Sequence, residues 1–224
     1  MNNNYNYMFK FIVVGDAFVG KTSLLLQFQQ KEFCEDTQST VSIEFRQKTI
    51  TLNDQSIKLQ AWDPAGFTQF LSMEKFYYKG AIGALLVFDF SRRSTFEDIK
   101  FWLNQIKTFA CDKIELVLVG NKSDLSKKHV TIQEVEEFAK QEKLDFYETS
   151  AKTGKNVDIV FESLASKILR KIETKQINVD DQMLGIKVNN NYGKMKKNNK
   201  SPQQNITLNG KQNDEERNEK QRCC

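Results

Sequence analysis

Residues 8–172 alternate between two kinds of hydrophobic pattern. Three runs, at 9–14, 81–88 and 114–119, are apolar, β-branched or aromatic and lack alternating polar residues, as parallel strands covered on both faces do. Elsewhere apolar residues recur at helical spacing, as at 96–106 and 157–168. The pattern therefore predicts strands that alternate with helices.

Two local signals refine this prediction. Ile57, Leu59 and Ala61 alternate with polar residues after a turn signal at 53–55, which predicts one hairpin. Thr131 and Glu134 are spaced as in a capping box that begins a helix. The resulting order, βαββαβαβαβα, predicts an α/β fold with a doubly wound, mostly parallel six-stranded sheet and helices on both faces. Such sheets bind ligands beyond the carboxyl ends of their strands.

The character of the chain changes after residue 172. Asparagine becomes frequent and apolar residues scatter, so this stretch buries too little surface to offset its ordering entropy. We therefore predict a flexible N-terminus at 1–7, a folded domain at 8–172 and a flexible tail at 173–224.

Composition and charge narrow the function classes. The chain has 224 residues, of which 39% are hydrophobic, with 33 basic against 29 acidic groups and a net charge of +4. This balance provides no basic face for nucleic acid. A single histidine argues against a zinc site built on imidazoles, and four cysteines without a paired framework favour a reducing compartment. The sequence shows no signal peptide and no apolar run long enough to span a bilayer, so we expect a protein that is neither secreted nor transmembrane.

Residues 15–22 carry the clearest chemical signal. They read Gly-Asp-Ala-Phe-Val-Gly-Lys-Thr and stand between a predicted buried strand and a predicted helix, the context that a phosphate-binding P-loop requires. Backbone N–H groups would face the phosphates, Lys21 would reach the β and γ positions, and the Thr22 hydroxyl would bind Mg²⁺. The alternative is a glycine-containing turn with a surface lysine.

Two further motifs follow predicted strands and belong at the same sheet edge. Residues 121–124 read Asn-Lys-Ser-Asp, and residues 149–152 read Thr-Ser-Ala-Lys. A carboxylate such as Asp124 can accept hydrogen bonds from the N1–H and 2-amino groups that guanine has and adenine lacks. Either motif alone could be an ordinary polar loop. A P-loop kinase is a further alternative, but it would not need Asn121 or Asp124.

With these motifs the chain resembles the Ras superfamily of small GTPases over residues 8–172, and most closely its Rab branch. Rab-like stretches lie at 41–45, 58–66, 77–81 and 86–89. The resemblance implies that Thr40 closes on Mg²⁺ and the γ-phosphate, that Asp63 holds Mg²⁺ through water, and that the Gly66 N–H senses the γ-phosphate. It also implies that Phe33 packs on the guanine.

The residues that would act in such a protein fall into three groups. The catalytic group is Lys21, Thr40 and Gly66. The nucleotide-binding group is Ala17, Phe18, Val19, Gly20, Lys21, Thr22, Ser23, Phe33, Thr40, Gly66, Asn121, Lys122, Asp124, Ser150, Ala151 and Lys152. The effector-binding group is Ile43, Phe45, Trp62 and Tyr77, for two of which, Phe45 and Trp62, a purely structural role is an equal alternative.

The sequence departs from the family pattern at Phe67, where the family carries a glutamine. That glutamine orients the attacking water, and a phenylalanine has no amide for the task. We therefore expect slow intrinsic hydrolysis of GTP to GDP without an activating protein, or alternatively a GTP-locked, catalytically inert scaffold. Phe18 and Ala17 are also bulkier than the family's usual P-loop residues, so the Phe18 ring must point away from the phosphates or hinder a partner.

The chain ends in Cys223 and Cys224, which resembles the doubly prenylated ending of Rab proteins. Two lipid chains give stable membrane attachment where one is marginal. The alternative is a pair of free thiols on a frayed end. The resemblance implies a monomeric switch in vesicle trafficking on the cytoplasmic face of an intracellular membrane, cycling with the cytosol. Its partners would be effectors, an exchange factor, a GTPase-activating protein and a prenyl-binding chaperone.

Overall fold

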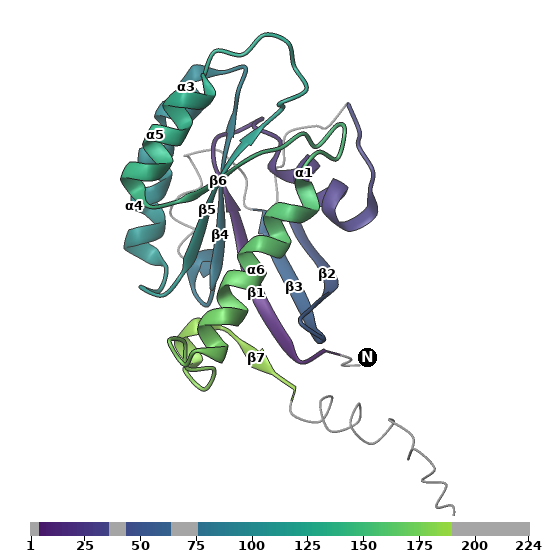
Figure 1. The fold of residues 1–224 in the computed structure, drawn as a ribbon, viewed down its shortest axis with the longest axis vertical. Helices are drawn as coiled ribbons and strands as arrows, with labels where there is room; N and C mark the ends of the chain where they lie inside the picture. Colours follow the sequence, from purple (N-terminus) through teal and green to yellow (C-terminus); the bar gives the residue numbers. More distant parts are fainter. Residues whose placement is uncertain (1–4, 36–43, 64–75, 190–224) are drawn as a thin grey trace, which may run out of the picture.

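A computed structural model describes residues 5–35, 44–63 and 76–189 (Figure 1). The strands are β1 (Tyr7–Val14), β2 (Glu44–Leu52), β3 (Gln55–Asp63), β4 (Gly83–Asp89), β5 (Glu115–Asn121), β6 (Asp145–Glu148) and β7 (Lys187–Val188). The helices are α1 (Lys21–Gln30), α3 (Arg93–Glu97), α4 (Ile99–Phe109), α5 (Ile132–Glu142) and α6 (Val157–Glu173), with a 3₁₀ turn η2 (Gln182–Leu184).

The strands form one sheet in the order β2-β3-β1-β4-β5-β6. The β2–β3 hairpin is antiparallel, and every other pair along this path is parallel. This confirms the predicted doubly wound, mostly parallel sheet. The count of six strands needs one correction, because β7 also pairs with β1, in antiparallel fashion.

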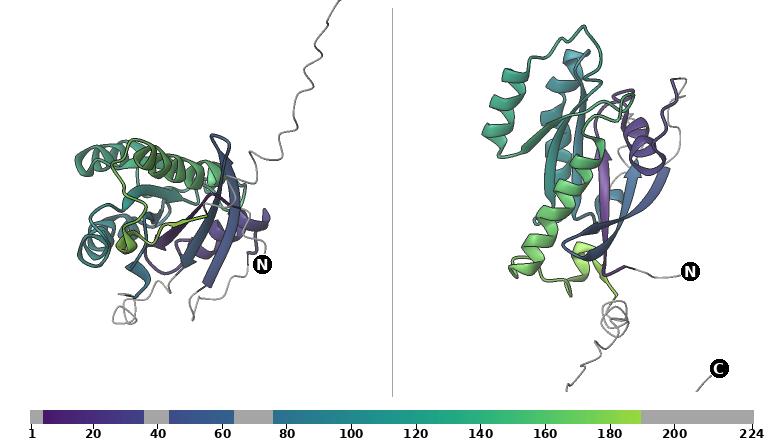
Figure 2. Two further views of the ribbon diagram at one scale, coloured as in Figure 1. Left: turned by 90° about the horizontal axis from the view of Figure 1, so that it is seen from below. Right: turned by 45° about the vertical axis from the view of Figure 1, so that its right-hand side comes forward.

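Helices cover both faces of the sheet, as the two views of Figure 2 show. Alternate residues of the apolar strands divide between these faces. Phe9, Phe11 and Val13 of β1 pack with residues of α1 and α6, whereas Ile12 and Val14 pack with residues of α4 and α5. Two apolar faces on each central strand explain why the predicted strands lack polar alternation.

The structure contains both the predicted hairpin turn and the predicted capping box. Asn53 and Asp54 form a two-residue hairpin turn with φ of 47° and 61°, a conformation that short polar residues tolerate. The Thr131–Glu134 capping box is confirmed, since the Thr131 side chain accepts from the Glu134 N–H and the Glu134 carboxylate accepts from the Thr131 N–H. The helix predicted over 96–106 is divided between α3 and α4.

Residues 173–189 were predicted to belong to the tail, but the structure packs them against the domain. Ile177, Leu184 and Ile186 are buried with residues of α6 and β1. The β7 residue Val188 pairs with Tyr7, beside the segment where β1 pairs with β4. Apolar residues alternate at 184, 186 and 188 as in a strand, but the run is short and stands in a mostly polar stretch. The described helices include none that is both long and apolar enough to cross a bilayer.

Candidate functional site

Three loops meet at the carboxyl end of the sheet, at the top of Figure 1. The parallel register aligns the strand ends, since Val14 pairs with Leu86, Asp89 with Asn121, and Gly120 with Glu148. Residues 15–20 and 149–152 directly follow β1 and β6, and residues 121–124 begin with the last residue of β5. The register therefore brings together the three motifs that the sequence placed at one edge.

Two glycines allow this close approach. Gly15 has φ of 144°, and a Cβ there would lie 2.1 Å from the Val87 carbonyl oxygen. Gly20 has φ of 94°, and its Cβ would lie 2.5 Å from Asn121 Nδ2. Only glycine fits these backbone conformations without strain. Gly20 also precedes α1, whose first N–H groups point beyond the helix N-terminus and favour an anion.

Side chains hold the carbonyl groups of five consecutive P-loop residues. Lys21 Nζ donates to the Gly15 and Asp16 carbonyls, both at 2.9 Å. The Ala17 carbonyl accepts from Arg92 Nη2 at 2.7 Å. The Phe18 carbonyl accepts from Lys122 Nζ, and the Val19 carbonyl from Asn121 Nδ2, both at 2.9 Å. A loop whose carbonyls are held in this way can present its N–H groups to an anion, as a phosphate-binding nest does.

Asn121 connects the P-loop to the third motif. Its side chain is 1% exposed, and its Oδ1 accepts from the Ala151 N–H at 3.2 Å and from Thr149 Oγ1 at 3.3 Å. The Ser150 hydroxyl donates to Asp124 Oδ1 at 2.6 Å, which orients the exposed Asp124 carboxylate. One asparagine and one serine therefore fix the relative positions of all three loops.

Thr22 and Asp63 supply the chemistry of a magnesium site. The Thr22 hydroxyl donates to Asp63 Oδ2, and the Asp63 side chain is fully buried at the end of β3. Hydroxyl and carboxylate oxygens are ligands that Mg²⁺ accepts, so these two residues fit the ion. Ser23, the next residue of α1, is also buried.

The segment after α1 is tied to the loop at 149–152 by an ion pair. Phe33 is 39% exposed, and two residues later Glu35 accepts from Lys152 Nζ at 2.6 Å. This hydrogen bond lowers the pKa of Glu35 and raises that of Lys152. The contact brings the chain that carries Phe33 to the 149–152 loop.

The predicted effector-binding aromatic residues form one group on the β2–β3 hairpin and the segment before β4. Phe45 pairs with Trp62 across the hairpin, with ring centroids 5.0 Å apart, and Tyr77 lies 6.4 Å from Trp62. Phe45 is 43% exposed, and Lys10 Nζ lies over the Trp62 ring.

The remaining predicted residues lie outside the described part of the chain. They are Thr40, Ile43, Gly66, Phe67, Cys223 and Cys224.

Three supporting residues were not predicted from the sequence. Asp89 and Arg92 contact the other loops from the end of β4, and Trp102 Nε1 donates to the Asp16 carboxylate at 2.7 Å. Partial burial raises the pKa of Asp16, which the Trp102 hydrogen bond opposes. Asp89 directly follows the apolar run at 81–88 and ends the Rab-like stretch at 86–89, but neither signal assigned it a role.

Comparison with known proteins identifies the family of this chain. The sequence model of the Ras family matches residues 10–170. Ras-related protein Rab-2B of Dictyostelium discoideum is 44% identical over 174 residues, which cover 77% of this chain and 86% of that protein. Ras-related protein Rab-4A is 42% identical in both Mus musculus and Homo sapiens, over 187 residues that cover 83% of this chain and 86% of each relative.

Proposed function

This chain belongs to the Ras family, as a Rab GTPase of vesicle transport that hydrolyses GTP, and on that premise we propose that the loops at 15–22, 121–124 and 149–152 form its nucleotide site. In this proposal GTP and GDP occupy the site in turn, and the two states differ in the effector-binding surface. The contacts of Asn121 with the Val19 carbonyl and the Ala151 N–H are the observation that carries the proposal.

The proposed roles follow from the donors and acceptors at the site. The P-loop N–H groups and Lys21 bind the β- and γ-phosphates, and Asp124 accepts from the guanine edge. Thr22, Asp63 and Thr40 would hold Mg²⁺, with Asp63 acting through water. When bound, the ion neutralises the charge that develops on the phosphates. Gly66 would sense the γ-phosphate through its N–H group, and Phe33 would pack on the base.

Calorimetry with the nucleotide-free full chain tests this site. We expect GDP to bind at least about 100-fold more tightly than ADP, because adenine would leave the Asp124 carboxylate without its donors. Asp124→Asn should remove most of this preference. Asp112→Asn, an exposed carboxylate change at the opposite end of the sheet, is the matched control and should keep it. Equal affinities for GDP and ADP in the unmodified chain would refute the proposal.

We further propose that intrinsic hydrolysis is slow because Phe67 replaces the water-orienting glutamine. Single-turnover cleavage of GTP in Phe67→Gln should be faster than in the unmodified chain, and equal rates would overturn the idea. Nucleotide binding is expected to be the same in both, since the P-loop and guanine contacts are unchanged.

Phe67 also supports a second candidate, a GTP-locked scaffold that binds effectors without cycling. The nucleotide extracted from purified protein separates the two. Mostly GDP indicates a cycling switch, whereas mostly GTP indicates the locked scaffold.

The terminal Cys223 and Cys224 support a proposal for membrane attachment through two prenyl chains. Attachment of this kind would place the domain on the cytoplasmic face of an intracellular membrane, with exchange between membrane and cytosol through a prenyl-binding chaperone. A tagged copy should localise to membranes, and its Cys223→Ser/Cys224→Ser version should be diffuse. Membrane localisation of the double variant would contradict the proposal.

A further inference from the structure

Arg92 makes a contact with the P-loop to which the proposed nucleotide chemistry assigns no role. It lies directly before α3, and its Nη2 donates to the Ala17 carbonyl at 2.7 Å. The next carbonyl along the loop, that of Phe18, accepts from Lys122 Nζ. Two consecutive P-loop carbonyls are therefore held by cations that come from the ends of two different strands.

Asp89 supplies the negative charge that both cations share. Its side chain is 1% exposed, and its Oδ2 lies 2.9 Å from Lys122 Nζ and 3.4 Å from Arg92 Nε. Its Oδ1 accepts from the Ser91 N–H at 2.8 Å and from the Ser91 hydroxyl at 2.7 Å, which fixes the carboxylate. A buried carboxylate with two cationic partners is sensitive to the loss of either, because the remaining charges are then poorly compensated.

The part of the loop that these side chains hold is also strained. Phe18 has φ of 64°, the left-handed region that is unfavourable for an aromatic residue. Its side chain is 58% exposed, so burial of the ring contributes little toward offsetting that cost. A glycine at this position would adopt the same conformation freely.

We propose that Arg92 and Asp89 are positioning residues for the P-loop. Together with Lys122 they form a clamp on the Ala17 and Phe18 carbonyls, and this clamp keeps the strained turn in the conformation whose N–H groups bind phosphate. The proposal rests on the nucleotide site proposed above. It assigns to the end of β4 the task of compensating for a bulky residue in the loop.

Arg92→Gln tests the clamp, because it keeps a long polar side chain and removes the charge. In the full chain loaded with a fluorescent GDP analogue, we expect dissociation to become about tenfold faster, the effect of losing a hydrogen bond to a charged donor. Arg93→Gln is the matched control. Arg93 is the adjacent arginine and pairs with Glu97 and Glu134, so its replacement should change the rate by less than about twofold, as for exposed ion pairs.

Two further readouts separate positioning of the P-loop from a general loss of stability. In a Phe18→Gly background Arg92→Gln should accelerate dissociation by less than about threefold, because glycine does not need the clamp. Arg92→Gln should also weaken GDP more than GMP, which lacks the β-phosphate that the loop N–H groups bind. A general destabilisation would act equally in both backgrounds and on both nucleotides.

Each outcome has a defined meaning. Faster release in Arg92→Gln, reduced by Phe18→Gly and larger for GDP than for GMP, supports the clamp. If the unmodified chain retains GDP and Arg92→Gln behaves like Arg93→Gln, or acts equally in the two backgrounds or on the two nucleotides, the clamp is refuted while the nucleotide site stands. If the unmodified chain does not prefer GDP to ADP, the nucleotide site is refuted and the clamp with it.

Discussion

The two ends of the central sheet are held together by different interactions. At the carboxyl end, the side chains of Lys21, Arg92, Asn121 and Lys122 donate to backbone carbonyls of the P-loop. Hydrogen bonds of this kind depend steeply on distance and angle. The loop therefore has a defined shape only as long as each donor remains in place.

At the amino end, apolar packing and strand pairing hold the elements together. Ile177, Leu184 and Ile186 are buried against α6 and β1, and β7 pairs with the start of β1. Gly185 lies so close to the backbone of Gly80 that only glycine fits at position 185. Apolar burial is non-directional and tolerates small displacements better than a hydrogen-bonded loop does.

This contrast predicts where a substitution affects nucleotide binding and where it affects stability. A distortion at the carboxyl end changes the positions of groups that would contact nucleotide. A distortion at the amino end changes the free energy of unfolding and leaves those groups in place. A pair of glycine substitutions with the same steric defect at the two ends puts this difference to the test.

Gly15→Ala should have the largest effect. The new Cβ would lie 2.1 Å from the Val87 carbonyl oxygen, at a φ that favours glycine, so the P-loop must move. We expect GDP affinity to fall by at least about 100-fold, as for the loss of several kcal/mol. Titration with a fluorescent GDP analogue measures this, and circular dichroism shows whether the variant is folded. Retention of GDP by the folded variant within about tenfold would contradict the prediction.

Gly185→Ala produces the same 2.1 Å approach at the other end, here to the Gly80 carbonyl oxygen. We expect the free energy of unfolding, measured with urea, to fall by about 2–4 kcal/mol as residues 185–189 shift away. GDP affinity should stay within about twofold, since the site lies at the opposite sheet end. Lys187→Ala, at an exposed neighbour on β7, is the control and should change little. A loss of GDP affinity comparable to that in Gly15→Ala would mean that the two ends are coupled.

The sequence predicted most of the fold because the strands are buried on both faces. The runs at 9–14 and 114–119 are apolar except for one charged residue each and lack polar alternation, which is typical of such strands, and they correspond to β1 and β5. The contribution of Ile177 and Leu184 to the core was missed because they lie in a mostly polar stretch with only a short apolar alternation at 184–188. Their burial depends on a surface formed by α6 and β1, which no local pattern encodes.

The candidate site was predictable for a related reason. Parallel strands end at one edge, so motifs that directly follow 9–14, 114–120 and 145–148 had to converge. The partners of the P-loop carbonyls could not be predicted in the same way. Arg92 and Ala17 are separated by 75 residues, and nothing in either segment specifies a contact between them.

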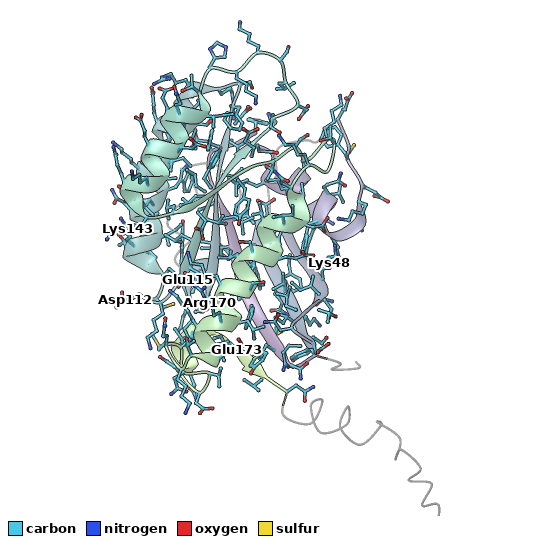
Figure 3. All side chains as sticks on the ribbon, in the orientation of Figure 1. Lys48, Asp112, Glu115, Lys143, Arg170 and Glu173 are labelled. Carbon is cyan, nitrogen blue, oxygen red and sulfur yellow. The ribbon has the colours of Figure 1, made fainter. Side chains whose placement is uncertain are left out.

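Asp158, in the first turn of α6, provides a prediction that depends on pH. Its carboxylate pairs with Lys31 and, at 3.1 Å, with Lys48. Figure 3 shows Lys48 on the opposite side of α6 from Glu115. Partial burial opposes ionisation, but the two lysine hydrogen bonds outweigh it and hold the pKa of Asp158 below its ordinary value. A depressed folded-state pKa adds stability above the unfolded value of about 4, and this contribution is lost as the pH falls through the folded-state pKa.

Asp158→Asn should therefore lower the free energy of unfolding by less than about 1 kcal/mol at pH 7, since the side chain is 37% exposed and solvent weakens the pair. The difference from the unmodified chain should shrink toward zero as the pH falls through the lowered folded-state pKa, below which both states bind the proton. Urea unfolding at several pH values measures the difference, with Asp112→Asn at the amino end as the control. A difference that is the same at low and neutral pH would mean that Asp158 acts through packing rather than through its charge. The carboxyl end of the sheet would then depend less on electrostatics than its contacts imply.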